Sequence, residues 1–421
     1  MGRLILSAAT LAAGLLGGGM LHAQLIPSVG DTIHSVTRLP SELLGEMTPP
    51  LRDTLRAADM LATERLARLR LFAERNREAV ELDADGNPAV RGEIVAVDPS
   101  EAVMEAATKA GFTVARDERI EGIDLRSVTL RPPAGWSLRK AMAQLRRSAP
   151  KGSFTPNHIL MPSGGFPVGA SDAPLATGDA GQSPIGLIDG GVARHPAIGA
   201  VEQRGFAQGA PSASSHGTAV ASLIIRGGAP GSALIVADIY GRDPAGGNAV
   251  AIARALGWMA SRRVAVVTLS LVGPPNPLLA RAVSAVSAKG MQIVAAVGND
   301  GAAAPPAYPA SYPGVVAVTG VDGRNRPLIE TGRALHIDYA APGADMAAAS
   351  AKGGIMAVRG TSFAAPLVAG RLAAHYRTSD PGRRGAALAA LDKEARDLGA
   401  RGPDRLYGRG LVCADCRTVV R

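Results

Sequence analysis

From Pro184 onward, short apolar segments alternate with longer segments whose apolar residues recur at helical spacing. The apolar segments, which predict strands, are 185–188, 233–239, 264–271, 292–297 and 315–318. The helical segments are 216–225, 249–261, 277–289 and 363–376. Continuously apolar strands that alternate with helices are typical of a parallel sheet covered on both faces. The sequence therefore predicts an α/β fold, a doubly wound and mostly parallel sheet with helices on both faces, whose ligands bind at the carboxyl ends of the strands.

The chain upstream of this region predicts a second, smaller unit. Residues 91–163 follow the order β-α-β-β-α-β, which predicts a small α+β domain, a ferredoxin-like plait. Its strands are expected at 92–97, 113–120, 127–130 and 154–161, and its helices at 100–110 and 137–147. Residues 24–90 are polar, and an amphipathic helix over 51–80 is expected to pack on its own neighbour. Residues 164–183, rich in Gly, Ala, Pro and Ser, predict a flexible linker to a domain over 184–421.

The N-terminus indicates export. Arg3 precedes an apolar stretch over 4–20, and the small residue Ala23 follows, which is typical of a secretory signal peptide over 1–23. A transmembrane anchor is the alternative, but four glycines in the stretch make it a poor helix. No later segment is long and apolar enough to span a bilayer. We therefore expect an exported protein, periplasmic or extracellular, with no stable membrane span after the signal is removed.

Charge and cysteine content argue against two other classes of protein. The formal net charge is +9, but the basic residues are scattered and only 3% of the residues are aromatic. A nucleic-acid surface normally needs both a basic stripe and stacking rings, so no nucleic-acid partner is expected. Cys413 and Cys416 predict either a local disulfide or two unpaired thiols. One such pair cannot supply the four ligands of a structural zinc site.

Three residues stand where the predicted sheet would place reactive groups. Asp189 ends the first strand, whereas His216 and Ser362 each open a helix. A serine hydroxyl becomes an effective nucleophile when an imidazole takes its proton, and a carboxylate fixes the tautomer of that imidazole. Free N–H groups at a helix start also favour negative charge beside Ser362. Asn299, which follows a strand, is a candidate donor to the oxyanion of a tetrahedral intermediate, together with the N–H of Ser362.

These segments resemble the motifs of the subtilisin-type serine proteases, the subtilase family. The resemblance is carried in chain order by residues 188–192, 216–218, 268–271, 295–301, 360–366 and 404–410. Several motifs in the correct order are more specific than a single one. Ala219, Phe363 and Leu367 stand where the family often has His, Met and His. None of these departures removes a group that performs acid–base chemistry.

The resemblance implies a serine endopeptidase that acts through an acyl-enzyme intermediate. Ser362 would attack, His216 would shuttle the proton, Asp189 would orient His216, and Asn299 would stabilise the oxyanion. The resemblance also implies substrate-binding residues: an edge that pairs with an extended substrate, and the walls of an apolar pocket for the residue before the scissile bond. The edge would be Ser270, Leu271 and Val272, and the walls Ala296, Val297 and Gly298.

The resemblance gives the plait a meaning as a propeptide. Such a domain would inhibit the enzyme or aid its folding, and the protein would be made as a zymogen. The last strand of the domain, around 159–161, would lead into the active cleft. The alternative is that 24–163 is a permanently attached domain. The polar segment 24–90 is not explained by the resemblance. The chemistry requires no cofactor or metal. A structural calcium ion, common in the family, stays an open alternative without assigned ligands, because no dense carboxylate loop here matches an EF-hand and any such site would be irregular.

Two further functions were weighed against an exported endopeptidase. A catalytically silent binding or scaffold protein would keep the same fold and is distinguished only by an assay. An esterase of the α/β-hydrolase type predicts a G-x-S-x-G elbow and the order Ser, acid, His. The order Asp189, His216, Ser362 contradicts the esterase hypothesis.

Overall fold

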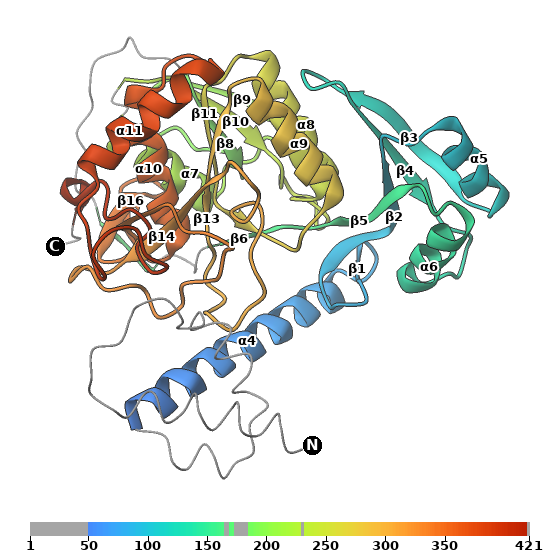
Figure 1. Cartoon of the computed structure of the whole chain (residues 1–421), viewed down its shortest axis with the longest axis horizontal. Coiled ribbons are helices and arrows are strands. Elements are labelled where there is room, and N and C mark those ends of the chain that lie inside the picture. The colour runs from blue at the N-terminus through green and yellow to red at the C-terminus, as the bar shows by residue number, and fades with distance from the viewer. Residues whose placement is uncertain (1–48, 164–167, 172–183, 229–230, 419–421) are drawn as a thin grey trace.

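Two sheets that lie on opposite sides of one pair of helices organise the chain (Figure 1). The computed structural model describes residues 49–163, 168–171, 184–228 and 231–418. The predicted signal peptide over 1–23, the first part of the polar segment and most of the predicted linker therefore lie outside the described residues.

The larger sheet has seven parallel strands in the order β15-β14-β13-β11-β8-β10-β9. These strands are β8 Ile185–Asp189, β9 Val201–Gly205, β10 Leu234–Asp238, β11 Val266–Leu269, β13 Gln292–Ala296, β14 Val316–Val321 and β15 Tyr339–Pro342. β8 lies between β10 and β11, so the strand order reverses beside it. In open α/β sheets this reversal opens a crevice at the carboxyl ends of the strands, where Asp189 stands. The doubly wound parallel sheet predicted from the sequence is confirmed.

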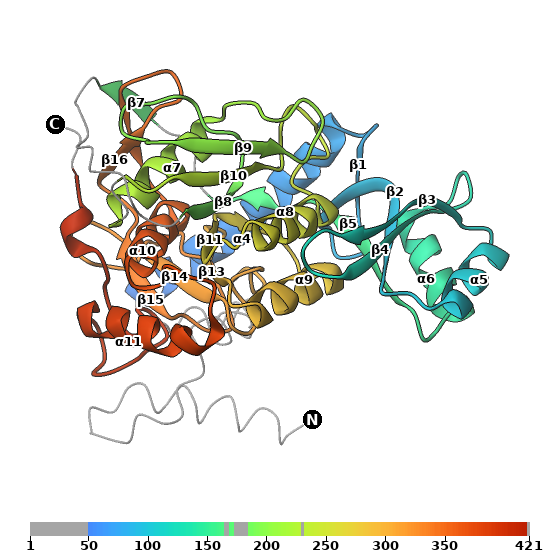
Figure 2. The ribbon, with the colours of Figure 1, turned by 90° about the horizontal axis from the view of Figure 1, so that it is seen from above.

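Helices cover both faces of this sheet, as the view from above shows (Figure 2). α7 Ser215–Arg226 and α10 Thr361–His375 pack on one face, and α8 Ala249–Ser261 and α9 Pro277–Ala288 pack on the other. The side chains of consecutive strand residues alternate between these layers: Leu187 belongs to the first core and Ile188 to the second. Strands buried on both faces must be apolar throughout, which explains the continuous apolar runs in the sequence.

Smaller elements complete the C-terminal part of the chain. They are β12 Leu271–Val272, the hairpin of β16 Met346–Ala349 and β17 Ile355–Val358, α11 Arg384–Glu394, and two short 3-10 helices, Pro381–Arg383 and Ala414–Cys416. Strand β7 Val168–Ser171 pairs with β17. This part of the predicted linker is therefore a strand, because the exposed edge of the hairpin offers it hydrogen-bond partners.

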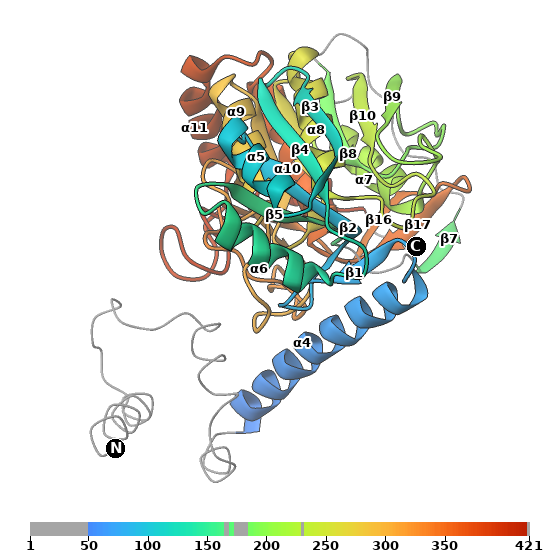
Figure 3. The same cartoon turned by 90° about the vertical axis from the view of Figure 1, so that its right-hand side faces the viewer.

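The N-terminal sheet is antiparallel. Its elements are β1 Val80–Leu82, β2 Pro88–Val97, α5 Glu101–Lys109, β3 Thr113–Ile120, β4 Leu125–Arg131, α6 Leu138–Ser148 and β5 Ser153–His158. β4 and β5 flank β2, β3 pairs with β4, and β1 pairs with the start of β2. Ile94 and Ala96 face α5 and α6, whereas Val95 and Val97 share a core with α8 and α9. Figure 3 shows α5 and α6 on the outer side of the sheet and the large domain behind it.

Two sequence predictions about this region are wrong at their ends. The helix expected over 51–80 is α4 Pro49–Arg75, because Val80 begins a strand that pairs with β2. The strand expected over 154–161 divides: β5 ends at His158, and β6 Met161–Pro162 pairs with β12 of the other domain. Local pattern does not show a strand that changes partner within eight residues. Among the described helices, none has both the length and the apolar character that a bilayer crossing requires.

Candidate active site

Asp189 and His216 form a hydrogen-bonded pair at the reversal point of the sheet. The Nδ1 atom of His216 lies 2.9 Å from each carboxylate oxygen of Asp189. Asp189 is 1% exposed, and one of its oxygens also accepts from the N–H of Gly190. In a neutral imidazole, the ring nitrogen beside a carboxylate is the one that carries the proton, and the other nitrogen, here Nε2, then presents a lone pair. Nε2 is buried and has no hydrogen-bond partner among the described residues.

Glycines allow the backbones that carry this pair to approach each other. A Cβ atom on Gly217 would lie 2.2 Å from the carbonyl oxygen of Gly190, and one on Gly190 would lie 2.4 Å from the hydroxyl of Ser214. Ser214 is the N-cap of α7, and its hydroxyl accepts from the N–H of Gly217 at 2.9 Å. These contacts fix the first turn of α7, and with it the ring of His216, directly beside the end of β8.

Ser362 is the second residue of α10 and is fully buried. Within the part of the chain that the structure describes, its hydroxyl has no hydrogen-bond partner, and its carbonyl accepts from the hydroxyl of Ser270 at 2.8 Å. The ring of the next residue, Phe363, lies 5.6 Å from the ring of His216, measured between centroids. The structure therefore brings the start of α10 to the ring of His216.

Asn299 lies in the turn that follows β13, which we call the oxyanion turn (298–301) after the role expected of Asn299. Its Oδ1 atom accepts from the N–H of Thr361 at 2.9 Å, so its Nδ2 group points the other way. That group is buried and has no partner among the residues described. The hydroxyl of Thr361 lies 3.1 Å from both the N–H and the carbonyl of Gly298. Gly360, with φ of 137°, lies so close that a Cβ would stand 2.8 Å from Nδ2 of Asn299. Thr361 therefore links the oxyanion turn to α10 by hydrogen bonds. This role was not predicted from the sequence, although Thr361 lies within one of the motifs that carry the resemblance.

The edge predicted to bind substrate is already paired with a segment of the same chain. Residues 159–163, which we call the tail, run antiparallel to β12, with Met161 opposite Val272 and Pro162 opposite Leu271. The N–H and the hydroxyl of Ser163 both donate to the carbonyl of Ser270, at 2.9 and 3.0 Å. Because Ser270 also bonds Ser362, the Ser163 end of the tail lies towards the candidate nucleophile.

A second edge holds the other side of the tail. The N–H of Leu160 donates to the carbonyl of Gly247 at 2.9 Å, and the phenol of Tyr240 donates to the carbonyl of Leu160 at 2.8 Å. Burial first, and then the carboxylates of Asp189 and Asp238, raise the pKa of the Tyr240 phenol well above its ordinary value, which keeps this donor proton in place. Tyr240 was not predicted from the sequence, because a single tyrosine after a strand carries no signal of this role.

The three residues predicted to wall the substrate pocket, Ala296, Val297 and Gly298, lie in different surroundings. The side chains of Ala296 and Val297 are fully buried in the two cores of the sheet, one on each face. Gly298, with φ of 91°, lies against Val272, since a Cβ there would be 3.0 Å from a methyl group of that residue. Of these three residues, Gly298 is the one that the structure brings against the edge paired with the tail.

Cys413 and Cys416 form a disulfide, one of the two states expected from the sequence. Within the described residues, the one cluster of ligand-type side chains close enough to hold a metal consists of these cysteines and Asp415. Sulfur atoms joined in a disulfide lack the thiolate charge that binds zinc, so this cluster does not fit a metal ion.

Comparison with known proteins agrees with this geometry. The model of the subtilase family matches residues 185–410, more than half of the chain. Subtilisin BL of Lederbergia lenta is 31% identical over 247 residues, which cover 56% of this chain and 90% of that protein. Subtilisin E of Bacillus subtilis is 29% identical over 249 residues, covering 54% and 63% of the two chains.

Among solved structures, fervidolysin of Fervidobacterium pennivorans, a keratinolytic enzyme related to subtilisin, has a similar fold. The TM-score is 0.65 at 20% identity, over 80% of this chain and 62% of fervidolysin. This coverage exceeds the 56% matched by Subtilisin BL, so the likeness of fold extends beyond the large domain. The chain belongs to the subtilase family and is a subtilisin-like serine endopeptidase.

Proposed function

We propose that this protein is an exported peptidase that uses Asp189, His216 and Ser362 as its catalytic triad and is made as a zymogen. The observation that carries the proposal is the pair of 2.9 Å contacts between His216 Nδ1 and Asp189. These contacts leave Nε2 of His216 directed away from the carboxylate. The hydroxyl of Ser362, which has no partner among the described residues, lies at the start of α10, next to Phe363, whose ring packs against that of His216.

In the proposed mechanism, Nε2 of His216 takes the proton of Ser362 as its hydroxyl oxygen attacks the substrate carbonyl. The carboxylate of Asp189 stabilises the imidazolium that forms, and the same ring then donates the proton to the leaving amine. Nδ2 of Asn299 and the N–H of Ser362 stabilise the oxyanion of each tetrahedral intermediate. Water then hydrolyses the acyl-enzyme by the reverse proton path. No step requires a metal ion or an organic cofactor.

The pairing of the tail with β12 supports an inhibitory role for the N-terminal domain. An extended peptide substrate would bind the same edge by strand addition, so tail and substrate would compete for it. Parallel sheets fold slowly, so a domain whose sheet packs on α8 and α9 would have a second use as a folding aid. Cleavage that releases the tail would then activate the enzyme.

Two observations support export. The N-terminal sequence is typical of a signal peptide, and the disulfide between Cys413 and Cys416 is of a kind that persists in oxidising compartments. A relative that is 27% identical over 241 residues is the minor extracellular protease Epr of Bacillus subtilis. N-terminal sequencing of the protein recovered outside the cytoplasm tests export and processing together.

The triad is tested with Ser362→Ala, assayed on casein or a peptide substrate. We expect kcat/KM to fall by more than about 10⁴-fold, a scale taken from loss of the nucleophile in subtilisin. Ser232→Ala is the matched control, because Ser232 is also buried and its hydroxyl also has no partner among the described residues. Its loss should leave activity unchanged. Activity that survives in Ser362→Ala would refute the mechanism. Correctly processed wild-type protein without activity would instead support the silent scaffold.

A further inference from the structure

Helix α4 is the element that the family resemblance leaves unexplained. It is 27 residues long and precedes the N-terminal sheet. Figure 1 shows it running along the lower side of the large domain, and the view from above in Figure 2 shows it passing behind the parallel strands. Its inward-facing residues contact two parts of the candidate active site.

The first contact is with the oxyanion turn. The Nε atom of Arg65 lies 3.1 Å from one carboxylate oxygen of Asp300, and the guanidinium of Arg68 bonds the other oxygen. The side chains of Arg65 and Asp300 are 15% and 17% exposed, so this ion pair is largely shielded from water. A Cβ on Gly301 would lie 3.0 Å from Leu61, so the helix backbone approaches the turn closely. Asp300 directly follows Asn299, the proposed oxyanion donor.

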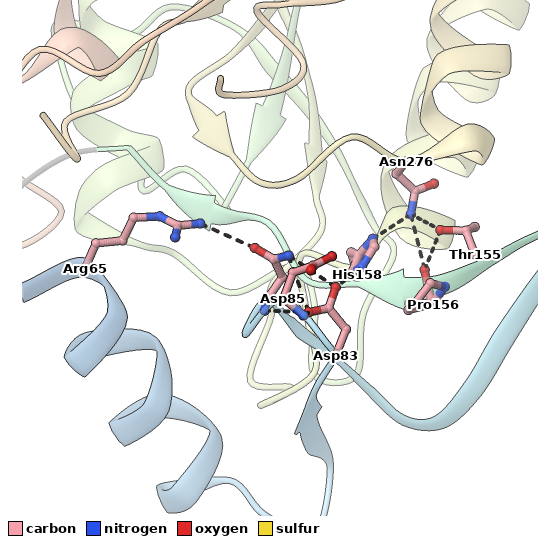
Figure 4. A network of polar contacts seen from close by, with 8 residues as sticks. Arg65, Asp83, Asp85, Thr155, Pro156, His158 and Asn276 are labelled. Atoms are coloured by element: carbon pink, nitrogen blue, oxygen red, sulfur yellow. Dashed lines mark hydrogen bonds and ion pairs between the residues drawn. The ribbon is translucent and has the colours of Figure 1, made fainter. Parts of the chain in front are cut away.

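The second contact is with the tail. Phe72 and Ala73, near the end of α4, share an apolar cluster with Ile159 and Met161 of the tail and with Ala245 of the large domain. Figure 4 shows Arg65 reaching from α4 towards the polar network around Asp83 and His158, at the end of the strand that leads into the tail. This link is the bond from Arg65 to Asn87 at 3.4 Å, and Asn87 in turn bonds Asp83.

We propose that α4 is a strap that holds the tail in the cleft and at the same time restrains the oxyanion turn. This inference rests on the proposed function and extends it: the N-terminal domain inhibits through two linked contacts, not through the tail alone. Contacts joined within one chain keep each other at high effective concentration, so the tail returns to β12 before a substrate replaces it. The surface that α4 occupies, formed by Asp300 and Gly301, fits a helix that presents Leu, Arg and Arg at positions 61, 65 and 68.

The test measures tail binding without using activity. In the full chain carrying Ser362→Ala, we compare Arg65→Ala/Arg68→Ala with the unsubstituted helix by amide hydrogen exchange. The reporters are the N–H groups of Leu160 and Ser163, which bond Gly247 and Ser270. We expect their exchange to be at least tenfold faster. Unchanged exchange in a chain that keeps its helical content would overturn the strap.

Two more variants keep the test sharp. Arg70→Ala is the matched control, because this exposed arginine of α4 forms no ion pair among the described residues, and it should leave exchange unchanged. Leu61→Ala is a milder change that removes the Cγ and Cδ atoms packed beside Gly301 but keeps Cβ and both arginines. Leu61→Ala should also speed the hydrogen exchange of Leu160 and Ser163. If Arg65→Ala/Arg68→Ala fails to fold, this variant takes its place in the test, and unchanged exchange in Leu61→Ala would then overturn the strap.

An activity measurement separates this inference from the proposed function. With Ser362 intact, the lag before peptidase activity reaches its plateau should shorten at least threefold in Arg65→Ala/Arg68→Ala and not in Arg70→Ala. An unchanged lag beside normal Ser362-dependent activity would overturn the strap alone. If the wild-type protein stays inactive after its N-terminal domain has been cleaved off, the proposed function is overturned. The amide hydrogen exchange of Leu160 and Ser163 in the full chain would still test the strap in that case.

Discussion

At the scale of single residues, the candidate site is marked by three buried polar atoms that have no partner in the described parts of the chain: Nε2 of His216, the hydroxyl of Ser362 and Nδ2 of Asn299. A buried polar group without a partner costs about 1–3 kcal/mol, so such groups call for an explanation. This property alone does not identify a catalytic residue, because Thr268 and Ser232 share it. The residues that carry these three atoms differ in being held by a neighbour. Asp189 bonds the ring of His216, and Ser270 bonds the backbone carbonyl of Ser362. The N–H of Thr361 bonds the amide oxygen of Asn299.

The orientation of Asn299 gives a prediction about turnover. Asn299→Ala should lower kcat by about 10²–10³-fold with little change in KM, a range that comes from the equivalent asparagine of a subtilisin. Asn299→Asp separates donation from positioning, because it keeps an oxygen that accepts from the N–H of Thr361 but replaces the Nδ2 donor. Steady-state kinetics should therefore show both variants to be defective. Wild-type kcat in Asn299→Asp would show that the amide only positions α10.

Much of the site was predictable from the sequence because its residues lie within short local motifs at strand or helix ends. Asp189, His216 and Ser362 each follow or open an element whose periodicity is strong. The roles of Tyr240 and Asp300 were not predictable, since each depends on a partner that is far away in the chain. Such pairings follow from how the two domains dock, and no local pattern encodes them.

At the scale of elements, the two domains meet where two glycines bring their backbones together. Gly122, in the turn between β3 and β4, and Gly257, within α8, approach so closely that a Cβ on Gly257 would lie 2.1 Å from the carbonyl oxygen of Glu121. Glycine inside a helix costs about 1 kcal/mol relative to alanine, so α8 carries a cost that the domain contact explains.

This contact predicts opposite effects for two chemically identical substitutions. Gly257→Ala in the chain carrying Ser362→Ala should lower the midpoint of thermal unfolding, because overpacking at the contact costs about 1–3 kcal/mol. Gly385→Ala in α11 should raise the midpoint, because alanine favours the helix and the added Cβ would meet nothing within 4 Å among the described residues beyond its chain neighbours and its own helix. Calorimetry of both variants provides the comparison. A higher midpoint for Gly257→Ala would mean that the domains do not dock at this glycine.

Element boundaries show which parts of the fold the sequence specifies locally. Helix α8 begins and ends where its periodicity predicts, at Ala249 and Ser261, because Asn248 caps its start. Strand β9, by contrast, reads Val-Glu-Gln-Arg-Gly and was missed. It lies at the edge of the sheet beside β10, where one side of the strand is free and polar residues are tolerated.

At the scale of the whole molecule, an apolar face and a polar network hold the N-terminal domain on the peptidase domain. Val95 and Val97 enter the core formed with α8 and α9. In the network, Asp83 accepts from Nε2 of His158 at 3.0 Å, and Asn276, the N-cap of α9, donates to Nδ1 of the same ring at 3.2 Å. One histidine thus connects the turn between β1 and β2 with a helix of the peptidase domain (Figure 4).

The ionisation of Asp83 makes this network depend on pH. Burial opposes ionisation, but the hydrogen bonds from His158 and Asn87 outweigh it and hold the pKa of Asp83 below its ordinary value of 3.8. A carboxyl group whose pKa is lower in the folded state stabilises that state above the unfolded pKa, and this stabilisation is lost as the pH falls through the folded value. The contribution of Asp83 is therefore complete at neutral pH and fades below pH 3.8.

Asp83→Asn tests this dependence in the chain carrying Ser362→Ala. The amide oxygen of the variant still accepts from the N–H of Asn87, but the amide carries no negative charge beside His158. The ring of His158 cannot compensate by reversing its tautomer, because Asn276 faces it with an N–H donor. The side-chain oxygen of Asn276 is already bonded to the first turn of α9. The variant should be less stable than the parent at pH 7, and the difference in urea midpoint should shrink as the pH is lowered from 4 to 3. A difference that stays constant or grows over this interval would contradict the role of the ionised carboxylate.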